Sequence, residues 1–186
     1  MPRLARLILA SRSPQRRAIL EQIGVVFEVR VPDVDELSEG PAAEVALENA
    51  YRKASAVAPA ELPVLGVDTV VSLGRRIFGK PRDAAHAVQM LTALAGQTHV
   101  VVSGVCLIEG DRTRTAAAQT AVAFRALDEA AIQAYVNAGE WEGRAGAYAI
   151  QGRGATLVTR IEGDYLNVVG LPVPTLVDLA PYLIAD

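Results

Sequence analysis

Hydroxyl and guanidinium groups gather where the first apolar segment of the chain gives way to a helix. The residues from Ser11 to Arg17 include two serines and three arginines. Ser13 suits a helix N-cap and Pro14 suits the first helical position. Free backbone N–H groups at such a junction attract anions, and arginine supplies planar donors that match phosphate. The segment therefore indicates phosphate binding, and an ordinary capped helix with solvated arginines is the alternative.

Asp68 places a carboxylate inside the apolar residues 63–73, which predict a strand. A carboxylate in apolar surroundings costs free energy unless a cation or a metal compensates it, and aspartate is a poor strand former. We therefore expect a compensating partner, and a function, for Asp68. The alternative is an aspartate at the strand end that accepts hydrogen bonds from a neighbouring loop.

Lys53 lies on the apolar face of a predicted helix, four residues after Asn49 and four before Val57. A solvated lysine is more typical of the opposite face. Two interpretations remain. Its side chain either passes the edge of the core to reach solvent or points into a cleft.

Gly79, Lys80 and Pro81 end a segment that nearly matches the phosphate-loop pattern G-x-x-x-x-G-K-[ST]. We reject that match, because Pro81 replaces the hydroxyl residue that would bind magnesium. A residue before proline also disfavours the α conformation, so Lys80 is not expected to begin a helix. The segment is predicted to be extended, and Lys80 can still reach a phosphate from there.

Residues 33–36 are acidic and include Asp33, Asp35 and Glu36. Hard divalent cations prefer oxygen ligands, so one of these carboxylates could hold such an ion together with Asp68. An acidic surface loop is the alternative.

The elements that must position these groups alternate between apolar strands and helical patterns, which is typical of an α/β fold. Glycines gather between residues 139 and 154, where Trp141 and Tyr148 offer either stacking on a base or core packing. Two lobes around a cleft would fit this order. Strands are predicted over residues 4–10, 25–31, 63–73, 98–108 and 115–125 and once more near the end, and helices over residues 14–24, 42–58, 84–95, 129–138 and from 174.

The composition excludes several classes of protein. A net charge of −3 gives no whole-molecule attraction for nucleic acid polymers. No run approaches the roughly 18 apolar residues of a spanning helix, so no membrane partner is expected. The single cysteine, Cys106, forms no internal disulfide or zinc cluster and is expected in the core. We expect a cytoplasmic protein with one domain over residues 1–186.

Seven short segments together resemble the Maf family of nucleotide pyrophosphatases, over nearly the whole chain from Leu9 to about Pro172. Each segment is weak alone, but their order and number make a chance match improbable. The resemblance implies the Maf or ITPase-like α/β fold, with an elongated mixed β-sheet flanked by helices and two lobes around a nucleotide-binding cleft. The matching segments are residues 9–17, 35–36, 49–54, 66–69, 79–81, 145–152 and 169–172.

The resemblance also implies a reaction: hydrolysis of a nucleoside triphosphate between its α and β phosphates, with a divalent cation such as Mg²⁺ or Mn²⁺. Asp68 matches the family's general base, and Glu36 matches a carboxylate that joins Asp68 at the metal. Such residues would work by positioning and by neutralising charge on a phosphoryl centre. The positions that hold the phosphates are matched by Ser11, Arg16, Lys53 and Lys80, and the two lysines count with Asp68 as catalytic.

Three positions indicate which nucleotide is preferred. The resemblance implies that the family has one branch that acts on dTTP and UTP and another that acts on 7-methyl-GTP, and these positions differ between the two. Thr69 and Gln151 match the pyrimidine branch. An amide both donates and accepts, which suits a uracil or thymine edge, whereas the glutamate of the other branch suits guanine. Gln15 departs from both branches, which have arginine or tryptophan there. The balance favours dTTP and UTP.

Three alternatives stay open. The first is a pyrophosphatase for 7-methyl-GTP or other modified nucleotides, which Gln15 keeps in view. The second is a nucleotide-binding regulator of septum formation, although a pure binder would not need a base, a metal carboxylate and both lysines. The third is a generic α/β domain with these residues as surface charges. The resemblance further implies a house-cleaning role and a homodimer as one assembly state.

Overall fold

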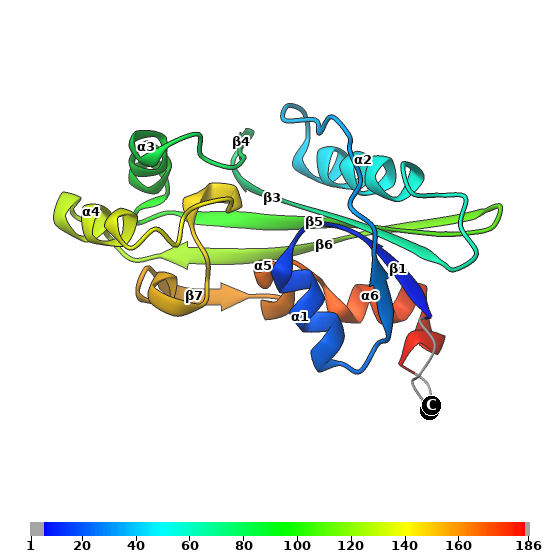
Figure 1. The fold of residues 1–186 in the computed structure, drawn as a ribbon. Coiled ribbons are helices and arrows are strands. Elements are labelled where there is room, and N and C mark those ends of the chain that lie inside the picture. The colour runs from blue at the N-terminus through cyan, green and yellow to red at the C-terminus, as the bar shows by residue number, and fades with distance from the viewer. Residues whose placement is uncertain (1–5, 185–186) are drawn as a thin grey trace.

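The computed structural model describes residues 6–184, which form a single seven-stranded sheet with helices on both faces (Figure 1). The strands follow the order β2-β1-β3-β5-β6-β7, with β4 on β3. Strand β1 runs parallel to β2 and β3, and the other pairs are antiparallel. The strands are β1 (Leu7–Ala10), β2 (Phe27–Val29), β3 (Val64–Leu73), β4 (Arg76–Phe78), β5 (Thr98–Glu109), β6 (Arg112–Phe124) and β7 (Val158–Glu162).

Three helices begin directly after the capping residues that the sequence indicates. Ser13, Asp83 and Asp128 cap helices by accepting the N–H groups of Arg16, His86 and Ala131. The predicted starts of these three helices are therefore confirmed. The helices are α1 (Pro14–Gln22), α2 (Ala42–Ser55), α3 (Ala84–Leu94), α4 (Glu129–Asn137), α5 (Tyr165–Val169) and α6 (Val173–Leu179), with 3₁₀ turns at Ala145–Ala147, Gly152–Thr156 and Pro181–Leu183.

The structure corrects several predicted boundaries. Strand β2 spans only Phe27–Val29 rather than 25–31, because it lies at the sheet edge and pairs with β1 alone. Helix α2 ends at Ser55 rather than 58. Strand β6 begins at Arg112 rather than 115, because Gly110 and Asp111 alone make the turn. Strand β4 and helix α5 were not predicted, since three and five residues carry too little periodicity. The start of the first predicted strand lies outside the described residues.

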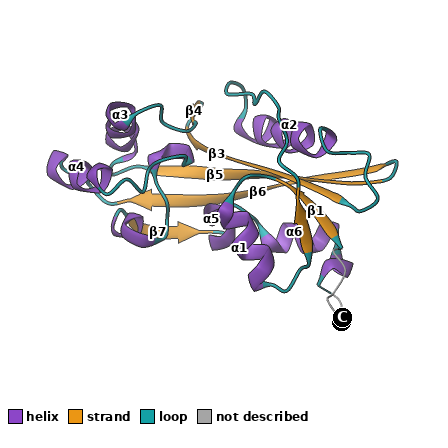
Figure 2. Cartoon of the chain, viewed as in Figure 1, coloured by secondary structure: helices purple, strands orange, loops and turns teal. Residues whose placement is uncertain are grey.

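Helix α2 covers one face of the sheet, and α1, α5 and α6 cover the other (Figures 1 and 2). Strand β1 serves both layers, because Leu7 and Leu9 pack with α1 and α6 whereas Ile8 and Ala10 pack with α2. Burial on both faces explains the continuous apolar sequence of this strand.

Glycines let α2 lie directly on the sheet. A Cβ atom at Gly66 would lie 2.1 Å from the carbonyl oxygen of Ala50, and one at Gly104 would lie 2.3 Å from that of Ala46. Both distances are far below van der Waals contact, so these positions admit only glycine while α2 stays in place. The close approach brings the α2 side chains Asn49 and Lys53 within reach of strand β3.

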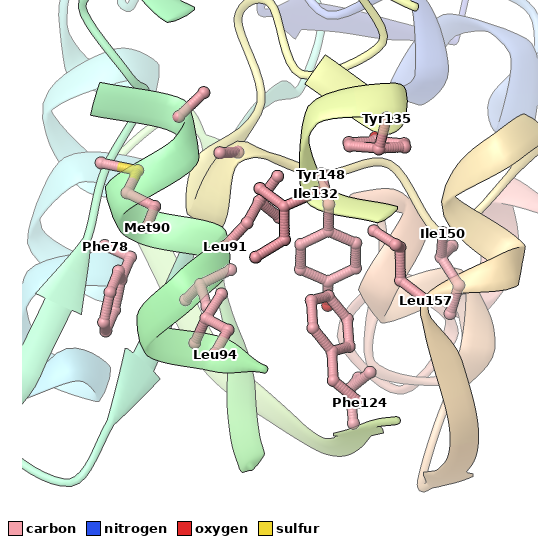
Figure 3. Close-up of a cluster of buried hydrophobic side chains, with 14 of the residues drawn as sticks. Phe78, Met90, Leu91, Leu94, Phe124, Ile132, Tyr135, Tyr148, Ile150 and Leu157 are labelled. Carbon is pink, nitrogen blue, oxygen red and sulfur yellow. The ribbon is translucent and has the colours of Figure 1, made fainter. Parts of the chain in front are cut away.

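A separate core lies at the far end of the β5–β6 hairpin, where α3 and α4 pack against residues of the glycine-rich segment (Figure 3). Phe124, Tyr148 and His99 meet edge to face, with ring centroids 4.8 to 5.4 Å apart. The hydroxyl of Tyr148 lies 2.8 Å from Nε2 of His99. Tyr148 is therefore a core residue, and so is Cys106 on β5.

Candidate active site

A cleft of about 960 Å³ opens between the β1–α1 junction, α2, β3 and the glycine-rich segment. Its walls combine segments that are far apart in the sequence. All nine residues to which the family resemblance gives a role line it, whereas Asp35 and Trp141 do not: the nine are Ser11, Gln15, Arg16, Glu36, Lys53, Asp68, Thr69, Lys80 and Gln151. Asp33 lines the cleft as well.

Asp68 has the compensating partners that its buried position requires. Its Oδ1 accepts a hydrogen bond from Nζ of Lys53 at 2.5 Å, and its Oδ2 accepts one from Nδ2 of Asn49 at 3.0 Å. Burial by itself raises the pKa of Asp68, but the charge and hydrogen bond of Lys53, the charge of Arg16 and the amide of Asn49 outweigh it and lower that pKa. The carboxylate is therefore ionised at neutral pH.

Lys53 points into the cleft, which decides between its two interpretations. The side chain is buried, and its ammonium lies between two carboxylates, 2.5 Å from Asp68 and 3.0 Å from Oε1 of Glu36. One cation thus serves two anions. Glu36 is the more exposed of the two acids, with 41% of its side chain accessible.

Arg16 is a buried cation whose hydrogen-bond acceptors are all neutral groups. Its guanidinium donates to the carbonyl oxygen of Gly170 at 2.9 Å, to Oγ of Ser11 at 3.0 Å and to Oγ1 of Thr69 at 3.2 Å. Burial lowers the pKa of Arg16, while the charges of Asp68 and Glu36 raise it. Within residues 6–184 no carboxylate forms an ion pair with Arg16, so its charge is available to an anion in the cleft.

The Ser11 hydroxyl is prepared to donate. It accepts hydrogen bonds from Arg16 and, at 3.2 Å, from the backbone N–H of Ser13. A hydroxyl carries one hydrogen and two lone pairs, so its own hydrogen remains for an acceptor in the cleft. We call the group formed by Ser11, Arg16, Glu36, Asn49, Lys53 and Asp68 the charged end of the cleft.

The opposite wall belongs to residues 140–154, which we call the loop end. Gln151 is exposed there, and Lys80 is exposed close by, since the carbonyl oxygen of Gly79 accepts the N–H of Gly146 at 3.1 Å. Among the described residues neither side chain has a hydrogen-bond partner. The structure therefore brings Gln151 and Lys80 to the cleft without joining them to the network at the charged end.

Gln15 and Trp141, which the sequence also offered for contact with the substrate, lie in different surroundings. The Gln15 side chain is half-buried, and its Oε1 accepts a hydrogen bond from the Ser13 hydroxyl at 3.2 Å. The Trp141 indole donates to the carbonyl oxygen of Val136 at 2.9 Å and does not line the cleft. Core packing rather than base stacking accounts for Trp141.

Sequence reasoning gave no role to two neutral residues that organise the charged end. Asn49 accepts the N–H of Leu37 at 2.7 Å and donates to the Leu37 carbonyl at 3.0 Å, which ties the acidic segment to α2 and brings Glu36 to Lys53. Ser103 lies opposite Thr69 on β5, with the two hydroxyl oxygens 2.8 Å apart. An amide on an apolar helix face was the available signal for Asn49, whereas Ser103 gave none.

The oxygen atoms of Glu36 and Asp68 fit a hard cation, because both carboxylates already converge on one positive charge. Within residues 6–184 no group of three or more histidine, cysteine, aspartate or glutamate side chains is arranged to hold a metal by itself. Mg²⁺ is commonly bound by one or two carboxylates together with substrate phosphates. The pair therefore suits an ion that arrives with a triphosphate.

Comparison with known proteins gives a consistent result. A family model described as "Maf-like protein" matches residues 6–181. A dTTP/UTP pyrophosphatase of Gloeobacter violaceus is 51% identical over 179 residues, which is 94% of each chain. Proteins of the same name from Symbiobacterium thermophilum and Bacillus cytotoxicus are each 45% identical and cover 95% and 94% of this chain. No helix within the described residues is long and apolar enough to cross a membrane.

Proposed function

This chain belongs to the Maf family, and we propose that it hydrolyses dTTP and UTP between the α and β phosphates, releasing a nucleoside monophosphate and pyrophosphate. The observation that carries the proposal is the charged end of the cleft, where an ionised carboxylate, two buried cations and an available hydroxyl meet. The names of the relatives at 45% to 51% identity support the same reaction.

In this proposal Asp68 is the general base. It is ionised at neutral pH, and it accepts a proton from the water that attacks the α phosphorus. A low pKa makes a carboxylate a weak base, so the attacking water must itself be acidified. A divalent cation held by Glu36 and Asp68 would lower the pKa of that water and neutralise phosphate charge.

The phosphate groups would lie along the charged end. Arg16 offers a planar cation held by three hydrogen bonds, and Ser11 offers a hydroxyl hydrogen. Lys80 reaches the cleft from the segment after β4. Glu36 and Asp68, which hold Lys53 in this structure, would hold the metal, and the ammonium of Lys53 would then be available to the phosphates. These contacts position the triphosphate and neutralise its charge, which is most of what phosphoryl transfer requires.

Base selection would belong to Gln151, with Gln15 as a second contact. The Gln151 amide is free to donate and accept, which suits the edge of uracil or thymine. The Gln15 carbonyl is engaged by Ser13, which leaves its amino group to face a ligand. Thr69 would not contact the base. Its hydroxyl is hydrogen-bonded to Arg16 and to Ser103, so it would support the contacts that Arg16 makes with the phosphates.

We further propose a cytoplasmic house-cleaning role and a homodimeric assembly, both of which rest on the family resemblance. Light scattering during gel filtration tests the assembly, and a mass of one chain, 19.7 kDa, would exclude a stable homodimer.

The reaction is tested by pyrophosphate release with Mg²⁺ or Mn²⁺ from dTTP, UTP, CTP, 7-methyl-GTP and the purine triphosphates, with Asp68→Asn in parallel. We expect rapid release from dTTP and UTP and a loss of about 10³-fold in Asp68→Asn, because a general base commonly contributes that much. A preference for 7-methyl-GTP would overturn the substrate. No turnover by the folded, metal-supplied protein would favour the nucleotide-binding regulator.

A further inference from the structure

The carboxylate of Glu140 binds the backbone of the loop end rather than a cation. Glu140 follows α4, and its two oxygens accept the N–H of Arg153 at 3.2 and 2.9 Å. One of them also accepts the N–H of Gly154 at 3.3 Å. Hydrogen bonds from backbone donors to a carboxylate are strengthened by its charge. This single side chain therefore fixes the backbone on one side of Gln151.

Gly152 makes that contact possible. Its φ of +65° is a conformation that favours glycine, and a Cβ atom there would lie 3.0 Å from both oxygens of Glu140. Any other residue would strain the backbone and press on the carboxylate. The turn after Gln151 is thus built around Glu140.

Tyr135 fixes the backbone on the other side of Gln151. Its hydroxyl accepts the N–H of Ala149 at 3.0 Å, while its ring lies in the buried cluster on the side of Ile150 and Leu157 (Figure 3). Burial raises the pKa of Tyr135, so the hydroxyl stays protonated at neutral pH. A Cβ atom at Gly154 would lie 1.6 Å from the carbonyl oxygen of Ala149, so the two anchored stretches of backbone touch.

Gln151 therefore lies between two anchors that both come from α4 and the turn after it. The anchored N–H groups belong to Ala149 and Arg153, two residues before and two residues after it. The amide of Gln151 has no hydrogen-bond partner of its own among the described residues. Ordering a free backbone costs conformational entropy, and the two anchors meet that cost before a nucleotide binds.

We propose that Glu140 and Tyr135 are positioning residues that hold Gln151 in place to read the base, and that they thereby set nucleotide selectivity. The inference rests on the proposed function, because it deepens the account of base choice in that reaction. Both residues act through Gln151. Their loss should affect discrimination between bases more than the chemical step at Asp68.

The test compares UTP with CTP, whose triphosphates are identical and whose bases differ in the donors and acceptors of one edge. kcat and KM are measured for Glu140→Ala, Glu140→Gln and Tyr135→Phe. Glu129→Gln is the control, since Glu129 is an exposed carboxylate in the first turn of α4. We expect the UTP-to-CTP ratio of kcat/KM to fall about tenfold in Glu140→Ala and about threefold in the two milder variants, mainly through KM for UTP.

Hydrogen exchange of the nucleotide-free proteins supplies a second readout. The N–H groups of Ala149 and Arg153 should exchange faster in Tyr135→Phe and Glu140→Ala respectively, and at the original rate in Glu129→Gln. Slow exchange in both variants, or faster exchange with an unchanged UTP-to-CTP ratio, would overturn the inference.

The Kd values of UTP and CTP, measured in an Asp68→Asn background, separate this inference from the proposed function. If no nucleoside triphosphate is hydrolysed by the original protein, the proposed function fails by itself. The positioning role then stands if Glu140→Ala raises the ratio of the Kd of UTP to the Kd of CTP, and it falls if this ratio is unchanged.

Discussion

The two ends of the cleft are built in different ways. Strand β3 and helices α1 and α2 carry most of the charged end, Ser11 and Glu36 lie in the segments that adjoin them, and the side chains hold one another through charges and hydrogen bonds. The loop end is carried by an irregular segment whose backbone is held by Glu140 and Tyr135. Chemistry common to all nucleoside triphosphates would thus rest on the rigid sheet. Base choice would rest on a segment that can change without disturbing that sheet.

The largest expected effect on stability comes from moving α2 away from the sheet. In Gly66→Ala the new methyl group would lie 2.1 Å from the Ala50 carbonyl oxygen, which is backbone and cannot turn aside. We expect a loss of about 3 kcal/mol or more in the free energy of unfolding, because overpacking against backbone is among the most costly changes. Urea unfolding measures it.

Gly152→Ala is the matched change at the loop end. Its neighbour is the flexible side chain of Glu140, so the cost should be about 1–2 kcal/mol, mainly from the positive φ. Equal destabilisation by the two variants would contradict the distinction between a rigid end and an adjustable one.

Acid should weaken the core beneath the loop end before it weakens the charged end. Burial lowers the pKa of His99 from 6.5 to about 4, so the unfolded chain binds a proton that the folded protein excludes. This contribution is complete above pH 6.5 and is lost as the pH falls toward 4. The difference between these two pKa values of His99 corresponds to about 3 kcal/mol in the free energy of unfolding. The pKa of Asp68 is lowered from 3.8, so its contribution persists above pH 4.

Urea midpoints at pH 7 and pH 4.5 test this order. We expect His99→Gln to reduce the pH dependence strongly, because the glutamine side chain does not titrate. An unchanged pH dependence in this variant would show that other groups control acid sensitivity.

Arg16→Lys should cost about 2–3 kcal/mol in transition-state stabilisation, which is roughly a hundredfold in kcat/KM. A lysine keeps the charge but cannot reach Gly170, Ser11 and Thr69 together in the plane that the guanidinium occupies. The loss should be the same for UTP and CTP, because both carry the same phosphates. A loss confined to one base would place Arg16 in base reading.

Ser103→Ala should have the smallest effect, a loss of about 1 kcal/mol in transition-state stabilisation. The change removes one hydrogen bond to Thr69, while Arg16 still holds that residue. We expect a decrease of a few-fold in kcat, measured by pyrophosphate release. A loss as large as that of Arg16→Lys would mean that Ser103 itself contacts the substrate.

The sequence allowed much of the charged end to be predicted, because its residues are costly where they stand. A carboxylate at 68 in an apolar strand and a lysine at 53 on an apolar helix face each require an explanation, and they explain each other. Asn49 and Ser103 are neutral, so the amide of Asn49 on an apolar helix face is only a weak signal and Ser103 gives none. The role of Gly66 was also hidden, because it depends on a helix that crosses the strand from elsewhere in the chain.

The fold was predictable to the same extent. The α/β class and the capped helix starts follow from local chemistry. Strand β4 and the edges of β2 depend on which strands pair, which no local pattern reveals. Glu140 escaped notice because an exposed-looking glutamate in a glycine-rich segment is ordinary until its backbone partners, 13 residues away, are known.

The most direct test of the separation between the two ends is a measurement of kcat/KM for dTTP and 7-methyl-GTP in Asp68→Asn and Gln151→Glu. We expect Asp68→Asn to lose about 10³-fold in kcat/KM on either nucleotide, without a change in the ratio between the two substrates. We expect Gln151→Glu to shift this ratio toward 7-methyl-GTP while kcat on the better substrate stays within about tenfold of the original. An unchanged ratio in Gln151→Glu, or a changed ratio in Asp68→Asn, would contradict this separation.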